Sequence, residues 1–80
     1  MDVIFDNEAV KFLEKAEKSV SGRIWKKILI AKENPFHFFE KLSGRKDFKM
    51  RVGDYRVIAD IDDCIKITLI EHRKNIYKNI

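Results

Sequence analysis

Cysteine is nearly absent from this sequence, and so are the segments that direct a chain into or across a membrane. Cys64 is the single cysteine among 80 residues, so no internal disulfide can form, and a reducing compartment suits the chain. No charged-then-apolar leader opens the sequence, and no apolar run approaches the roughly 18 residues of a membrane span. We therefore expect a cytoplasmic protein that is neither secreted nor membrane-spanning.

The sequence also lacks the residue clusters of several kinds of active site. His37 and His72 are far apart and have no cysteine or acidic partners at the spacing of a metal site. No Ser-His-Asp order, pair of catalytic acids or glycine-rich phosphate loop is present. Cys64 has no neighbouring base and His37 lies between aromatic residues, so we expect neither to be catalytic. These absences predict a protein without a metal ion or a small-molecule cofactor.

Size and charge indicate an open, positively charged surface. A chain of 80 residues forms one domain, residues 1–80, and buries only about 60% of its unfolded surface, which leaves little core for a deep pocket. Lysine and arginine number 17 against 13 acidic residues, and the whole excess of +4 lies in residues 41–80. Such segregation is typical of a phosphate-binding surface, although small lysine-rich domains are also often merely soluble.

The first half of the chain has the pattern of a strand followed by two helices. Val3–Phe5 is a short β-branched and aromatic run, and apolar residues recur at helical spacing over residues 9–20. Serines and a glycine at 19–22 interrupt this helix. A second helix is predicted over roughly residues 23–33, ending at Asn34-Pro35 because a residue before proline avoids the helical region. Its buried stripe is predicted to contain Ile24, Ile28 and Ala31, widened by Trp25 and Leu29.

The second half alternates as β-strands do. After a linker over residues 36–44, strands are predicted over 48–52, 55–61 and 64 to about 70, with turns at Gly53-Asp54 and Asp62-Asp63. Residues 72–80 form a polar tail with a short helix. The order β-α-α-β-β-β predicts an α+β fold, in which a helical hairpin packs on one face of a three-stranded antiparallel meander.

The turns decide which side chains share a face. A two-residue loop at Gly53-Asp54 places Arg51 opposite Arg56 and Lys49 opposite Ile58. The helix-facing side then collects Phe48, Met50, Val52, Tyr55 and Val57. For the next hairpin, a three-residue loop at 61–63 pairs Asp60 with Cys64 and sends Ala59, Ile65, Ile67 and Leu69 to the core. A two-residue loop would expose the last three, so the longer loop is the better prediction.

Three cations, Lys49, Arg51 and Arg56, are thereby predicted on the uncovered side of the sheet. The cross-strand pair Arg51–Arg56 brings like charges together and costs the fold a few tenths to about 1 kcal/mol. On that side only Asp60 is in a position to relieve it. Because the Arg51–Arg56 pair destabilises the fold, its presence favours a role in binding an anion such as RNA. The same charges could stabilise a pentacoordinate phosphate. The alternative is a solvated face with outward-splayed side chains.

Three segments are together similar to a known family. They are Leu42-Ser43-Gly44, the string Phe48–Ile58 with R-V-G-D-Y-R, and Glu71–Tyr77 with H-R-x-x-x-Y. In order and spacing they resemble the RelE/ParE superfamily of type II toxin–antitoxin toxins, most closely the RelE branch of mRNA-cleaving toxins. The N-terminal strand and helical hairpin match the layout of that superfamily, so the resemblance covers nearly all 80 residues.

The resemblance to RelE implies a ribosome-dependent endoribonuclease that inhibits translation without a metal ion. Such toxins enter the ribosomal decoding site and promote attack of an RNA 2′-hydroxyl on the adjacent phosphate, leaving a 2′,3′-cyclic phosphate and a 5′-hydroxyl. The matching catalytic positions are Lys49 and Arg51 before the turn, Arg56 to hold the scissile phosphate, Arg73 to stabilise or protonate the leaving oxygen, and Tyr77 to stack on the nucleotide. Nearby Arg45, Lys46 and Lys74 are expected to bind RNA.

Two features of this chain depart from the resemblance. Well-known bacterial members have lysine at the position of Arg51, assigned as a proton acceptor, and arginine cannot easily take that role. Either Lys49 or His72 is then the base, or Arg51 acts only as a charge. Strict alternation from Leu69 would also send Arg73 to the core side, so the family resemblance alone supports its assignment.

The family also implies partners, and it leaves a second function open. A cognate antitoxin would wrap the toxin and displace or occupy its C-terminal helix, where Ile76 and Ile80 are suited to such a contact. The ribosome and messenger RNA would be the targets. The alternative is a ParE-like toxin that binds and poisons DNA gyrase without catalysis, and an inert RNA-binding or structural domain is a third hypothesis. The full set of basic residues favours the nuclease.

Overall fold

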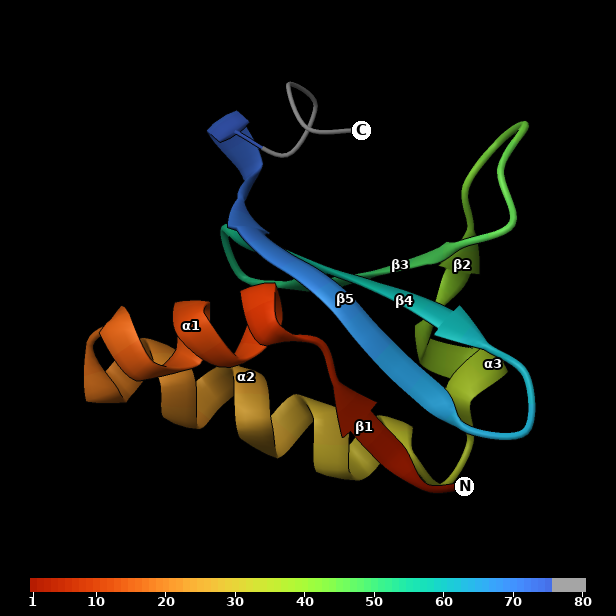
Figure 1. The fold of residues 1–80 in the computed structure, drawn as a ribbon, viewed down its shortest axis with the longest axis horizontal. Helices are drawn as coiled ribbons and strands as arrows, with labels where there is room; N and C mark the ends of the chain where they lie inside the picture. Colours follow the sequence, from red (N-terminus) through yellow and green to blue (C-terminus); the bar gives the residue numbers. More distant parts are fainter. Residues whose placement is uncertain (76–80) are drawn as a thin grey trace.

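The computed structural model describes residues 1–75 and has the α+β fold that the sequence predicts. The elements are β1 (Val3–Phe5), α1 (Asn7–Lys15), α2 (Lys18–Ala31), α3 (Pro35–Phe38), β2 (Glu40–Lys41), β3 (Phe48–Val52), β4 (Tyr55–Ile61) and β5 (Ile65–His72). The helices α1 and α2 lie together on one face of the sheet (Figure 1). A C-terminal helical turn begins at residues 73–75, and the rest of the predicted helix lies outside the described residues.

The sheet has five strands in the order β1-β5-β4-β3-β2. The predicted meander of β3, β4 and β5 is antiparallel, and β1 adds to it in parallel beside β5, so the sheet is mixed rather than wholly antiparallel. The segment predicted as a plain linker contains α3 and β2, and Lys41 of β2 pairs with Phe48 of β3. The alternation of apolar and polar residues could not predict β2, because a strand of two residues is too short to show the two-residue period.

The two long helices meet at a different point from the predicted one. The break falls at Ala16 and Glu17, whose backbones are extended with ψ of 156° and 148°, and residues 19–22 lie inside α2. The Ser21 hydroxyl donates a hydrogen bond of 2.7 Å to the carbonyl of Leu13, at the end of α1. A serine expected to interrupt a helix thus satisfies a terminal carbonyl of the preceding one. The predicted end at Asn34-Pro35 is confirmed, since α2 stops at Ala31 and Asn34 has φ of −150°.

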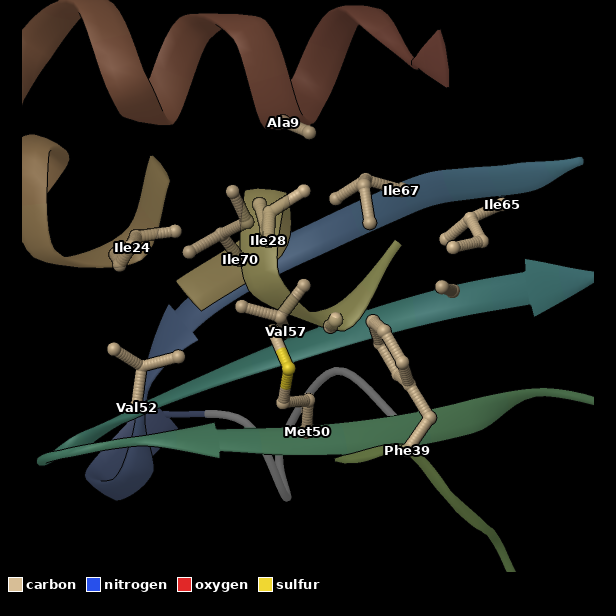
Figure 2. Packing of buried hydrophobic residues seen from close by; sticks show 12 residues of the cluster. Ala9, Ile24, Ile28, Phe39, Met50, Val52, Val57, Ile65, Ile67 and Ile70 are labelled. Carbon is tan, nitrogen blue, oxygen red and sulfur yellow. The ribbon is translucent and has the colours of Figure 1, made fainter. Parts of the chain in front are cut away.

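The core lies between the helical hairpin and the sheet (Figure 2). Its buried members come from α1 and α2, from Phe39 and from three strands: Ala9, Ile24, Ile28, Ala31, Met50, Val52, Val57, Ala59, Ile65, Ile67 and Ile70. The predicted stripe of α2 is too wide, because Trp25 and Leu29 are 46% and 44% exposed. Trp25 instead stacks on Phe5 at the margin of the core, with ring centroids 5.5 Å apart.

A β-bulge in β5 reverses the predicted facing of that strand's second half. Ala59 pairs with Ile67 but Ile58 pairs with Leu69, so Thr68 is an extra residue in β5. The preceding loop has three residues, as predicted, but lies one position later and pairs Ile61 with Ile65. The bulge turns Leu69 away from the core, where it was predicted, and turns Ile70 into it.

Candidate functional site

The β3–β4 hairpin has the predicted register, which places Arg51 opposite Arg56 and Lys49 opposite Ile58. We use the name open face for the sheet surface away from α1 and α2. Its central residues, from β3, β4 and β5, are Lys49, Arg51, Arg56, Ile58, Leu69 and Glu71. Lys49 is half-buried and Arg51 is exposed. The two cations of β3 therefore share the open face, as the alternation predicts.

Arg56 is buried rather than splayed into solvent. Its side chain bends back onto its own turn, where Nη1 donates to the carbonyls of Gly53 at 3.1 Å and Tyr55 at 2.9 Å. Only 6% of the residue is exposed, and its Nε has no hydrogen-bond partner within residues 1–75. Arg56 lies on the predicted side of the sheet, but its guanidinium does not project from that side as the sequence predicts. Backbone carbonyls compensate the charge that faces Arg51.

A carboxylate that sequence reasoning did not assign to the open face lies opposite Arg56. Glu71 of β5 is its cross-strand partner, whereas Asp60, the predicted one, pairs with Lys66 near the other end of the strand. The bulge at Thr68 causes this, because it moves Glu71 from the predicted core side to the open face. The like-charge pair of Arg51 and Arg56 therefore has an acidic neighbour.

Arg73 lies beside the hairpin turn. Its backbone N–H donates to the carbonyl of Asp54 at 2.7 Å, and its Nε lies 3.8 Å from Oδ1 of the same residue. The side chain is 58% exposed. Strict alternation along β5 would have placed Arg73 on the core side, in conflict with its assignment from the family resemblance. The bulge at Thr68 reverses the facing of the residues that lead up to Arg73, so the conflict disappears. Arg73 and Arg56 therefore contact the same turn.

His72 lies on the other side of the sheet from the open face. Its ring packs edge-on against Tyr55, with centroids 5.3 Å apart, and its Nδ1 accepts a hydrogen bond of 3.1 Å from the backbone N–H of Lys74. It lines a cavity of about 610 Å³ with Phe12 of α1 and Tyr55. The structure thus separates this candidate base from Lys49 and Arg51, while Lys74 is exposed at the start of the C-terminal turn.

The loop between β2 and β3 rises on the side of the sheet away from α1 and α2 (Figure 1). Arg45 and Asp47 form a two-point ion pair there, with N–O distances of 2.8 and 2.9 Å, and this hydrogen bonding holds the pKa of the Asp47 carboxyl below its ordinary value. Both residues line a shallow pocket with Ile58, which is only 1% exposed. Arg45 is thus engaged within the protein, and Lys46 beside it is exposed.

A comparison with known families decides the identity of the chain. Residues 3–77 match the model of the ParE toxin of the type II toxin–antitoxin system parDE. The chain belongs to this toxin family. No curated protein matches the sequence of the toxin.

Solved structures of RelE toxins have the same fold as this toxin. The RelBE2 complex of Mycobacterium tuberculosis matches with a TM-score of 0.82 and 23% identity, over 90% of this chain and 96% of that one. The intact Escherichia coli RelBE complex matches with a TM-score of 0.76 and 23% identity, over 89% of this chain and 94% of that one. The RelE–RelB complex of Pyrococcus horikoshii matches with a TM-score of 0.74 and 29% identity, over 90% of this chain and 93% of that one. The RelE/ParE superfamily predicted from the sequence is thereby confirmed.

Several remaining expectations fall on or near the end of the described chain. Tyr77, Ile76 and Ile80 lie outside the described residues, so the position of Tyr77 stays a prediction.

Among residues 1–75 of the toxin, no group of three histidine, cysteine, aspartate or glutamate side chains could hold a metal ion. None of the helices in that part has the length and apolar character needed to cross a membrane.

Proposed function

We propose that this toxin is a ribosome-dependent endoribonuclease that cleaves messenger RNA by attack of a 2′-hydroxyl on the adjacent phosphate. One observation supports this most: Lys49 and Arg51 on the open face lie beside a turn that also holds Arg56 and Arg73. The reaction develops extra negative charge on a pentacoordinate phosphate, and fixed cations stabilise such charge. The products are a 2′,3′-cyclic phosphate and a new 5′-hydroxyl.

Each basic residue has a role suited to its surroundings. Arg51 is exposed and binds the RNA backbone, and Arg73 stabilises the leaving 5′-oxygen. Arg56 holds the scissile phosphate, which would provide an acceptor for its buried Nε once the side chains around the turn rearrange. An unsatisfied buried donor costs about 1–3 kcal/mol, which favours such an acceptor. Tyr77 stacks on the nucleotide, and Lys46, Arg45 and Lys74 bind the flanking strand.

Lys49 is our candidate for the proton acceptor. It shares the open face with Arg51, whereas His72 lies on the helix-facing side and its Nδ1 accepts a bond from the backbone. A lysine amine is a chemically possible general base, whereas arginine keeps its proton under all working conditions. Arg51 therefore acts as a fixed charge.

The cellular partners follow from the proposed activity. Several of the similar solved structures are complexes of a RelE toxin with its antitoxin. We infer that a cognate antitoxin binds this toxin in the cytoplasm, covers its basic surface and blocks access to the ribosome and messenger RNA. No small-molecule cofactor enters the reaction.

A gyrase poison is the second candidate, because the matching family model is that of ParE. Such a toxin would act by binding the enzyme and would not cut RNA. It would have no need to keep Lys49, Arg51 and Arg56 on one sheet face. The nuclease therefore accounts for more of this site.

Translation of a defined message in a purified system tests the two candidates. With the toxin present, primer extension should map new 5′ ends inside codons, and Arg51→Ala and Arg73→Ala should each reduce them strongly while leaving a slow cleavage rate that can still be measured. Lys66→Gln is the matched control, since Lys66 lies on the same sheet face but pairs with Asp60 and bridges to Asp6 at 3.5 Å. Intact message together with blocked supercoiling by purified gyrase would identify the second candidate.

A further inference from the structure

One acidic residue of the hairpin turn, Asp54, contacts Arg73 through both its backbone and its side chain. The Asp54 carbonyl accepts the backbone N–H of Arg73 at 2.7 Å, and Oδ1 of Asp54 lies 3.8 Å from the Arg73 Nε. Within residues 1–75, Asp54 is the one side-chain partner of this guanidinium. Both side chains are largely exposed, at 67% and 58%, so the pair lies at the surface where RNA would bind.

We propose that Asp54 is a positioning residue that orients Arg73 toward the scissile phosphate, an inference that rests on the proposed function. The backbone bond sets where the Arg73 side chain begins. The carboxylate then engages its Nε edge and leaves Nη1 and Nη2 for a phosphate. Arginine binds phosphate through a planar pair of donors, so an orientation that presents two nitrogens favours the bound state.

The surrounding charges explain why Arg73 needs such a partner. Arg56 and Arg73 both make contacts to the same turn, and Arg51 lies opposite Arg56. Cations so close together repel one another, and a long exposed side chain responds by turning into solvent. Asp54 offsets this repulsion for Arg73 at the position where the cation is used.

The turn itself is rigid enough to serve as a support. Gly53 has φ of +57°, and a guanidinium nitrogen of Arg23 from α2 lies 2.7 Å from the position that a Cβ would take. On the other side, Arg56 Nη1 binds the carbonyls of Gly53 and Tyr55. The Arg56 guanidinium thus holds the backbone carbonyls on both sides of Asp54, which fixes where the Asp54 side chain begins.

A double-mutant cycle on the full-length toxin tests the proposal. Asp54→Asn should lower the single-turnover cleavage rate on programmed ribosomes roughly fivefold, the upper range for an exposed ion pair, with the half-saturating ribosome concentration unchanged. In an Arg73→Ala background, Asp54→Asn should have no further effect. Asp62→Asn, in the exposed β4–β5 loop, removes the same charge and should leave the rate unchanged. If Asp54→Asn lowers the cleavage rate by the same factor in the wild-type and Arg73→Ala backgrounds, the proposal is overturned.

A measurement without ribosomes separates this proposal from the proposed function. The ¹⁵N-labelled Arg73 Nε–H should exchange with solvent several-fold faster in Asp54→Asn than in the wild type, while the thermal unfolding midpoint stays within the error. Unchanged exchange would show that Asp54 does not orient Arg73. If the wild-type toxin cuts no message, the proposed function fails, and the Nε–H exchange alone decides whether Asp54 holds this side chain.

Discussion

At the scale of single residues, the two arginines predicted to face each other behave differently because of their backbone surroundings. Arg51 extends into solvent, whereas Arg56 turns back to the carbonyls of Gly53 and Tyr55. The register could be predicted from Gly53-Asp54, since a two-residue loop leaves one possible pairing. The rotamer of Arg56 could not, because it depends on carbonyls that come together only when the turn has formed.

Gly53 provides the clearest stability test at this scale. Gly53→Ala should destabilise the toxin by about 1–2 kcal/mol, because a residue with a Cβ is strained at the left-handed φ of +57°. Urea unfolding should show a lower midpoint with the same slope. Gly22→Ala is the control, since it lies inside α2 with nothing within 4 Å of its Cβ position, and it should stabilise by about 0.5–1 kcal/mol. Equal midpoints for the two variants would contradict this account.

At the scale of elements, the bulge in β5 decides the composition of the open face. A run of Ile65, Ile67 and Leu69 has the alternation of a regular strand, so sequence reasoning extends one facing along all of it. The extra residue Thr68 reverses the sheet face to which the following side chains point. Its hydroxyl donates a hydrogen bond of 3.3 Å to the carbonyl of Ile58. Nothing in the local sequence marks the extra residue, because a bulge forms where the partner strand and the core require it.

Alanine substitutions at the two residues that follow the bulge distinguish the two registers. Ile70→Ala should cost about 2–5 kcal/mol, because this side chain is 1% exposed in the core. Leu69→Ala, on the open face and half-buried, should cost about 1 kcal/mol. Unfolding in urea measures both. A larger loss for Leu69→Ala would mean that β5 alternates without a bulge, as the sequence alone predicts.

The β2–β3 loop should respond to acid through Asp47. Since Arg45 lowers the pKa of this carboxyl in the folded state, its stabilising effect is present above the ordinary aspartate value of about 4 and is lost as the pH falls through the lower folded pKa. The effect is small, because Arg45 is 44% exposed and solvent screens the pair. Asp47→Asn should therefore unfold more easily than the wild type at pH 7, and the difference should shrink below pH 4. A difference that stays constant across this range would exclude the pair as its source.

At the scale of the whole molecule, the excess of +4 in the second half of the chain becomes a surface property. Within the described part of this half, β3, β4 and β5 place Lys49, Arg51, Arg56 and Lys66 on the open face rather than along the helices. Association with a polyanion should therefore depend strongly on salt.

Salt titration of binding to programmed ribosomes checks this arrangement. Arg51→Ala should reduce the slope of log K against log salt by about 0.7–0.9, the value for one lost phosphate contact. Lys66→Gln should leave the slope nearly unchanged, because Lys66 is already bridged to Asp6. Equal changes for both variants would indicate a diffuse charge effect instead of a defined binding face.

The sequence by itself determined the fold class, the hairpin register and the facing of Lys49 and Arg51, because periods of two and of 3.6 residues and a glycine turn are local signals. It did not determine where the helices meet, the pairing of β1, the burial of Arg56, or the positions of Glu71, His72 and Arg73. Those depend on the bulge, on packing between distant elements and on backbone carbonyls brought together across the turn. Only the folded chain creates these contacts, so only the tertiary structure decides which charges can act together.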